Sequence, residues 1–126
     1  MAIGKAAGKF SMKSTGVTVS MAASGGGANH VNLEGTATGF GTVIGTLTFL
    51  ADAPGAKSGR TTWLGAGYLD NGDTLQGSGD GVYAEIGKHK WRVRAIVRIS
   101  NGSLLLSDGE VSLEGRTYKG TLYDWT

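Results

Sequence analysis

The stretch from residue 88 to residue 100 constrains the fold more than any other part of the chain. Apolar side chains occupy every second position and basic side chains stand between them, with Ile96 as the single exception. Successive side chains of a β-strand point to opposite faces, so this pattern gives one dry face and one cationic face. A helix, with about 3.6 residues per turn, would scatter them around its circumference. The stretch is therefore predicted to be a strand near the centre of a β-domain. Its apolar positions are Trp91, Val93, Ala95, Val97 and Ile99, and its basic positions include Lys90, Arg92, Arg94 and Arg98.

The length and the absence of cysteine limit the architecture further. A chain of 126 residues has the size of one domain and can bury a core without metal ions. Because the chain has no cysteine, disulfides, a thiol nucleophile and a cysteine-based zinc site are excluded.

Residues 1–8 are small and weakly patterned, and we expect a flexible leader there, followed by one domain at residues 9–126. They lack the apolar core of a signal peptide, and no apolar run reaches the roughly 20 residues that span a bilayer, so a cytoplasmic location is expected.

Alternating segments separated by turn residues recur along the whole chain, and about eight strands can be counted. The Asn71-Gly72 pair is expected to form a type I′ hairpin turn, because both residues tolerate positive φ. No segment of ten or more residues combines helical periodicity with helix caps. The chain is therefore predicted to be all-β, as a single eight-stranded antiparallel β-barrel, with a two-sheet β-sandwich as the alternative. The predicted turns lie at 24–29, 40–41, 52–59, 70–73, 86–87, 101–102 and 114–115.

Glycine is the compositional outlier, with 23 residues against a single proline. The glycines lie inside strand-like patterns and show no collagen-like triplet period, which excludes a fibrous or low-complexity chain. Glycine within strands marks bulges, strong coiling or close backbone approach, and a small, tightly curved barrel needs all three. Gly77, Gly79 and Gly81 recur at every second residue, so one face of that strand has almost no side chains.

Sequence motifs for catalysis and for cofactors are missing. There is no Gly-x-Ser-x-Gly elbow, and His30 and His89 are interpreted as surface residues. The glycine-rich segments open no helix, which a dinucleotide fingerprint requires. The acidic turns at 70–73 and 77–80 lack the ligand spacing of calcium loops. We therefore expect no cofactor and no metal ion.

Asp80 is the one weak candidate for a catalytic residue. In one register of its strand, Gln76 and Asp80 point inward beside Trp91. A few polar groups that converge in an apolar interior are typical of a ligand pocket. An inward Asp80 would be a candidate general acid or base. A slip of one residue instead turns the neighbouring glycines inward and Asp80 outward, toward Arg92 and Arg94. The second register, with an outward and ion-paired Asp80, is favoured.

The basic face of the opening strand is a second candidate surface. Basic strands with exposed aromatic residues can bind single-stranded nucleic acid, and arginine is common in subunit contacts. The formal net charge is only +2, and Glu85, Glu110 and Glu114 lie on segments that neighbour the strand. A neutralised face or a subunit contact is therefore favoured over nucleic acid. The residues assigned to this face are Lys90, Arg92, Arg94 and Arg98.

Residues 33–49 resemble the Gly-Thr-rich strand pairs of allene oxide cyclase and dirigent-type barrels. The closing residues 115–125 are similar to the last strand of small bacterial barrels of that kind. The resemblance implies a barrel cavity for an apolar small molecule, and assembly into dimers or trimers. No catalytic residue of those families matches a position of this chain, so none is transferred.

These observations favour a barrel that binds a small, largely apolar molecule, with cyclase- or isomerase-like chemistry as the activity that the resemblance implies. The alternative is a non-enzymatic oligomeric or partner-binding module that uses the basic outer face. A third interpretation is a structural oligomer with a solidly packed barrel. The residues predicted to bind the ligand are Trp91, Trp63, Tyr68, Gln76 and Asp80.

Overall fold

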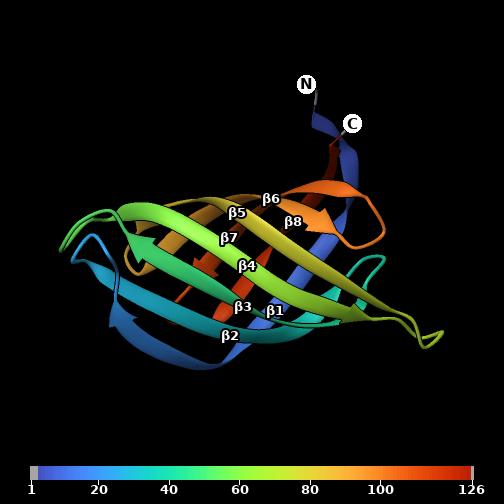
Figure 1. Cartoon of the computed structure of the whole chain (residues 1–126), viewed down its shortest axis with the longest axis horizontal. Helices are drawn as coiled ribbons and strands as arrows, with labels where there is room; N and C mark the ends of the chain where they lie inside the picture. The colour runs from blue at the N-terminus through green and yellow to red at the C-terminus, as the bar shows by residue number, and fades with distance from the viewer. Residues whose placement is uncertain (1–2, 126) are drawn as a thin grey trace.

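The computed structural model describes residues 3–125 and shows a closed antiparallel barrel (Figure 1). Each strand pairs with the next one along the chain, and the last strand pairs with the first, so the topology is up-and-down. The prediction of an all-β, eight-stranded barrel is confirmed, and the sandwich alternative is wrong. None of the described residues forms a helix that could cross a membrane. The strands are β1 (Ile3–Met21), β2 (Gly27–Ala37), β3 (Gly41–Ala51), β4 (Ser58–Tyr68), β5 (Thr74–Gly87), β6 (Lys90–Ile99), β7 (Leu104–Ser112) and β8 (Thr117–Trp125).

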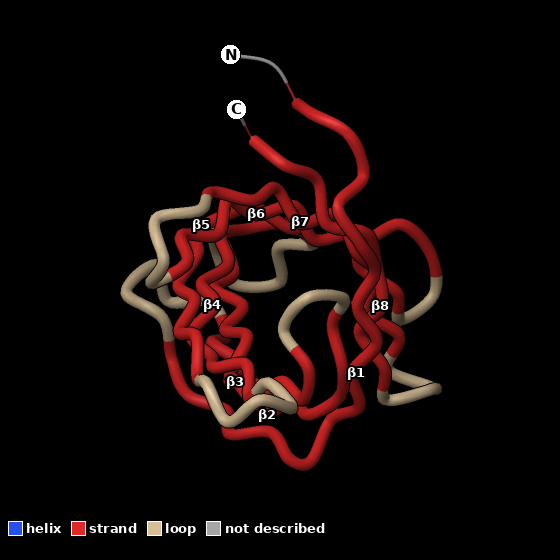
Figure 2. Tube along the Cα trace, turned by 90° about the vertical axis from the view of Figure 1, so that its right-hand side faces the viewer, coloured by secondary structure: helices blue, strands red, loops and turns tan. Residues whose placement is uncertain are grey.

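The beginning of the chain belongs to the barrel wall from residue 3 onward. Ile3 pairs with Trp125 and Gly8 pairs with Leu122, so the expected leader at residues 1–8 is instead part of β1 over residues 3–8. Residues 1 and 2 lie outside the described residues. The beginning of β1 and the end of β8 project together from the ring of strands (Figures 1 and 2). The long-range pairing with β8 supplies the order that the weak local pattern does not indicate.

A bulge divides β1 into two parts with different partners. Ser14 pairs with Leu33 and Gly16 pairs with Asn32, which leaves one extra residue on β1 between them. Before the bulge β1 pairs with both β2 and β8, but β8 begins opposite Lys13. From Gly16 onward, β1 pairs with β2 alone within the described chain. This end of the barrel therefore has a gap in its hydrogen-bonded wall, next to the turn between β7 and β8.

β6 has the two faces that its alternation predicts. Val93, Ala95, Val97 and Ile99 are buried in the barrel, and the basic residues between them are exposed, as is Ile96. The preceding turn lies at Lys88-His89, because Gly87 pairs with Lys90 and His89 adopts a positive φ of 55°. The turn predicted at 86–87 is therefore wrong by two residues.

The hairpin turn between β4 and β5 also differs from its prediction. Only Gly72 has a positive φ, of 94°, and its N–H donates a hydrogen bond to the carbonyl of Leu69 at 3.0 Å. The Leu69 N–H in turn donates to the Asp73 carbonyl at 2.9 Å. This is a three-residue loop with glycine at its left-handed position, in which Asn71 needs no positive φ. The Asn71 side chain instead accepts a hydrogen bond from the Asp73 N–H at 2.9 Å.

Glycines inside the barrel make room for large aromatic side chains, both on the same strand and on other strands. The Trp63 indole lies against Gly65 so closely that a Cβ there would be 2.5 Å from the ring. The Phe10 ring covers Gly109 and Gly120 in the same way, with 2.7 Å to a Cβ at either position. Phe10 and Tyr118 then meet edge to face, with ring centroids 4.8 Å apart. These three glycines are thus a packing requirement of an aromatic core in a narrow barrel.

Candidate functional site

The interior of the barrel contains two cavities of different size. The larger one, called the wide cavity here, has a volume of about 450 Å³ and opens at the end where β1 loses its contact with β8. The smaller one, called the small cavity, has a volume of about 80 Å³ and lies toward the other end. Leu47 and Tyr118 line both cavities and separate them. The wall of the wide cavity is mostly apolar and includes Val31, Leu33, Phe49, Tyr83, Trp91 and Val111.

The two tryptophans that were predicted to bind a ligand lie in different cavities. Trp91 is half-buried and lines the wide cavity, whereas Trp63 lines the small cavity among the glycines of β3, β4 and β5. Gln76 is an exposed residue of β5 at the edge of the small cavity. The sequence therefore identified a wall residue of each cavity but placed them in one pocket.

Tyr68 and Asp80 were predicted to bind the ligand, but both lie on the outer face of the barrel. Tyr68 is 48% exposed. Asp80 is exposed between the buried Gly79 and the half-buried Gly81, so the favoured outward orientation of Asp80 is confirmed. An outward Asp80 does not line a pocket inside the barrel, so its predicted place in the ligand site is wrong.

The expected ion pairs of Asp80 are also absent from the described residues. Asp80 faces Thr62 and Ile96 across the sheet, while Arg94 lies opposite Val82. The turn at residues 88–89, together with a bulge between Glu85 and Gly87, sets this register and places the arginines past Asp80. Asp80 therefore faces a threonine and an isoleucine, not the basic stripe.

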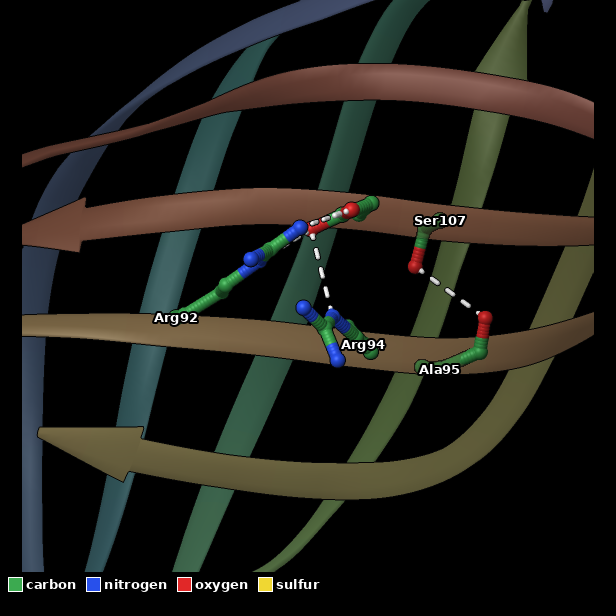
Figure 3. Close-up of polar contacts among 5 residues, drawn as sticks. Arg92, Arg94, Ala95 and Ser107 are labelled. Carbon is green, nitrogen blue, oxygen red and sulfur yellow. Dashed lines mark hydrogen bonds and ion pairs between the residues drawn. The ribbon is translucent and has the colours of Figure 1, made fainter. Parts of the chain in front are cut away.

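Asp108 on β7 is the acid that the arginines of β6 bind (Figure 3). Arg92 donates two hydrogen bonds to its carboxylate, from Nη2 at 2.7 Å and from Nε at 3.0 Å. Arg94 Nε lies 3.9 Å from the same carboxylate. The hydrogen bond from Arg92 lowers the pKa of Asp108, and the charges of both arginines add to this effect.

Sequence reasoning missed Asp108 and named three glutamates as partners of the basic stripe. Glu85 instead approaches Lys57 at 3.8 Å, and neither Glu110 nor Glu114 forms an ion pair with a described residue. The alternation of Ser107, Asp108 and Gly109 could have indicated an outward acid. The three successive leucines at 104–106 hide the face of this strand, because they fit either register.

Three strands of the outer face carry a hydrogen-bonded chain of side chains centred on His30. Its Nε2 lies 3.1 Å from Ser20 Oγ, and its Nδ1 lies 3.1 Å from Thr48 Oγ1. The order of groups is that of a nucleophile, a base and an orienting residue. A neutral threonine does not stabilise an imidazolium as a carboxylate does, and Ser20 is exposed on a strand. The chain is therefore interpreted as a cross-strand contact that joins β1, β2 and β3.

Few polar side chains lie inside the barrel. The buried ones include Ser107, Thr61 and Tyr118, and Tyr118 lies between the two cavities. Ser107 donates a hydrogen bond to the Ala95 carbonyl at 3.4 Å (Figure 3). Thr61 is 1% exposed, and its hydroxyl has no hydrogen-bond partner among the described residues. Burial raises the pKa of Tyr118 to about 12, and the neighbouring Ser107 hydroxyl offsets this effect only in part. Tyr118 therefore stays a neutral hydrogen-bond donor throughout the physiological pH range.

The raised pKa of Tyr118 predicts a loss of stability in alkali. The unfolded chain ionises this phenol near pH 10 and the folded protein only near pH 12. The free energy of unfolding should therefore fall as the pH rises through this window. In Tyr118→Phe the fall should be smaller, and the tyrosinate absorbance that develops near pH 12 should disappear. Urea unfolding and absorbance titration of both proteins check this; equal alkaline slopes would contradict it.

The described side chains that could ligate a metal ion are not grouped into a metal site. Within residues 3–125, no three histidine, aspartate or glutamate side chains are grouped so that they could hold a metal ion. Comparison of the chain with protein-family models, with curated proteins and with solved structures finds no match. The resemblance to allene oxide cyclase and dirigent barrels therefore stays a prediction, and functional inference has to start from the cavities.

Proposed function

We propose that the barrel binds a small, largely apolar molecule in the wide cavity. The observation that carries this proposal is an open, apolar-walled cavity of about 450 Å³ beside Trp91. Ligand sites in proteins are concave, mostly apolar and about 300–1,000 Å³ in volume. The small cavity, at about 80 Å³, is below this range. A ligand is thus expected at the end of the barrel where β1 and β8 separate.

The wall of the wide cavity is suited to a flat or branched hydrocarbon. Phe49 and Tyr83 meet edge to face, with centroids 5.0 Å apart, and fix one side of the cavity. Trp91 and Val111 face each other across β6 and β7 and form another part of the wall. Burial of apolar ligand surface contributes about 25 cal/mol per Å², and preformed aromatic walls lower the ordering cost of binding.

A cyclase- or isomerase-like reaction would have few polar groups at its disposal. Tyr83 and Tyr118 line the wide cavity, burial raises the pKa of both phenols, and the Tyr118 phenol also interacts with Ser107. Both groups therefore act as neutral donors toward a ligand carbonyl or ether oxygen. The barrel would then contribute its shape and these two donors, which supports binding more strongly than catalysis.

The basic outer face receives less support as a binding surface. Asp108 binds Arg92 and Arg94, so a free anion would have to compete with an existing carboxylate. Lys90 and Arg98 form no ion pair with a described residue, but they lie at opposite ends of β6. Contact with an acidic partner or with a second subunit through this face stays a prediction.

Tryptophan fluorescence tests the proposed function directly. Titration with decanol, a neutral apolar probe, should give a saturable change in emission as Trp91 is removed from water. Trp91→Phe should lose most of this change, because the other two tryptophans do not line the wide cavity. Trp63→Phe is the matched control and should keep it. Absence of saturable binding by decanol and by other uncharged hydrocarbon probes would contradict the proposal.

A further inference from the structure

We propose that the ligand of the wide cavity is an amphipathic carboxylate, and that Arg116 binds its charged end at the mouth of the barrel. This inference rests on the proposed function and adds the charge and the orientation of the ligand. The apolar part would lie against Trp91 and Phe49, with the carboxylate toward solvent.

Arg116 is the only charged residue among the described residues that line the wide cavity. It lies in the turn between β7 and β8, at the rim, where Val17 and Leu113 are also exposed. The floor of the cavity, formed by Leu47 and Tyr118, is buried. The cavity therefore has an apolar floor and one charged residue in its wall at the rim, although the carboxylate of Asp52 also acts on Tyr83. This arrangement suits a molecule with a hydrocarbon body and one anionic group.

The guanidinium of Arg116 is free to bind an anion. Arg116 is exposed, and no carboxylate of the described residues lies within ion-pair distance of it. Glu114, two residues earlier in the same turn, is not paired with it, and Asp52 accepts a hydrogen bond from Ser58 at 3.3 Å. A guanidinium presents two parallel N–H groups that match the two oxygens of a carboxylate.

The backbone of Arg116 adopts a conformation that glycine would adopt more easily. Its φ is +54°, in the left-handed region that favours glycine. The turn does contain a glycine, but it stands one position earlier, at residue 115. The backbone is fixed on both sides: the Ser14 N–H donates to the Arg116 carbonyl at 2.8 Å, and the Arg116 N–H donates to Leu113 at 3.3 Å. Left-handed non-glycine residues are strained and are concentrated at functional sites. The strain is explained if the side chain is needed at the mouth.

Calorimetric titration with three probes of equal chain length tests this inference: decanoate, decanol and decyltrimethylammonium. Arg116→Gly should lower the affinity for decanoate by about five- to tenfold, since a partly exposed charge pair is lost, and should leave decanol unchanged. Arg116→Lys should keep part of the decanoate affinity. Arg98→Gln, which removes an exposed arginine from the outer face of β6, should behave as the unchanged protein.

The same variants separate a binding role from a structural one. Because glycine adopts positive φ without strain, Arg116→Gly should have a melting temperature equal to or above that of the unchanged protein. Loss of decanoate affinity in a protein of undiminished stability supports the inference. Equal decanoate affinity in both proteins, or tighter binding of decyltrimethylammonium than of decanoate, would overturn it while decanol binding upholds the proposed function. If none of the three probes binds, the proposed function fails, and this inference with it.

Discussion

Replacement of Gly120 by alanine is expected to lower the free energy of unfolding by about 3 kcal/mol, or to prevent folding. Gly120 lies on β8 opposite Gly109 of β7, and the Phe10 ring covers both residues. A Cβ at position 120 would contact the backbone carbonyl of Asp108 and lie 2.5 Å from the Cα of Gly109. Backbone atoms within a paired ladder cannot move aside as the end of a flexible side chain can, so β7 and β8 would have to separate.

Gly16→Ala is the matched control for this prediction. Gly16 also lies in a strand, but a Cβ there would meet no atom within 4 Å. Its substitution should change the free energy of unfolding by no more than about 0.5 kcal/mol. Urea denaturation of the two variants measures the difference. Equal effects at both positions would mean that the substitutions act on the conformational freedom of the unfolded chain. Close packing at Gly120 would then not be the cause.

The glycines illustrate what the sequence could predict and what it could not. Their number and their place inside alternating segments correctly indicated close backbone approach in a small barrel. The spacing of Gly77, Gly79 and Gly81 correctly indicated a strand face without side chains. The partner of each glycine depends on pairing between distant strands, as with Phe10 over Gly120. A periodic pattern shows which face of a strand is bare and leaves open which side chain covers it.

The turns explain most of the errors in the predicted site. Residues with positive φ were expected at glycine and asparagine, but His89 and Arg116 adopt this conformation too. The shift of one turn to residues 88–89 and the bulge between Glu85 and Gly87 set the register of β5 against β6, which placed the arginines past Asp80. The local preference of a turn residue is weak evidence when the strands on both sides already determine the register. Asp108 was missed for a different reason, because the three leucines at 104–106 fit either face of β7.

The position of the cavity was beyond prediction because it depends on volumes summed over all eight strands. Trp91 and Trp63 were both recognised as inward aromatics, which period-two alternation can show. The packing of Leu47 and Tyr118 between them divides the interior, and this follows only from the closed ring of strands. A sequence can therefore indicate which residues face inward while leaving open whether they meet in one pocket or two.

Leu47→Ala is expected to lower the free energy of unfolding by about 3 kcal/mol and to change the size of ligand that the barrel accepts. Leu47 is 1% exposed and lies between the wide and the small cavity. Its truncation removes buried methyl groups and leaves a void that the closed strands around it cannot collapse to fill. Leu47→Met is the volume-conserving control, with an expected loss below about 1.5 kcal/mol. Urea denaturation distinguishes the two variants.

The same substitution joins the two cavities and so links the stability of the barrel to its proposed function. In the unchanged protein the affinity for linear alkanols should stop rising once the chain reaches Leu47 and Tyr118. In Leu47→Ala it should rise further with chain length, because each additional buried methylene contributes about 0.8 kcal/mol. Calorimetric titration with an alkanol series locates the length at which the affinity levels off in each protein. An unchanged limit in Leu47→Ala, with the expected loss of stability, would mean that Tyr118 alone closes the floor of the wide cavity.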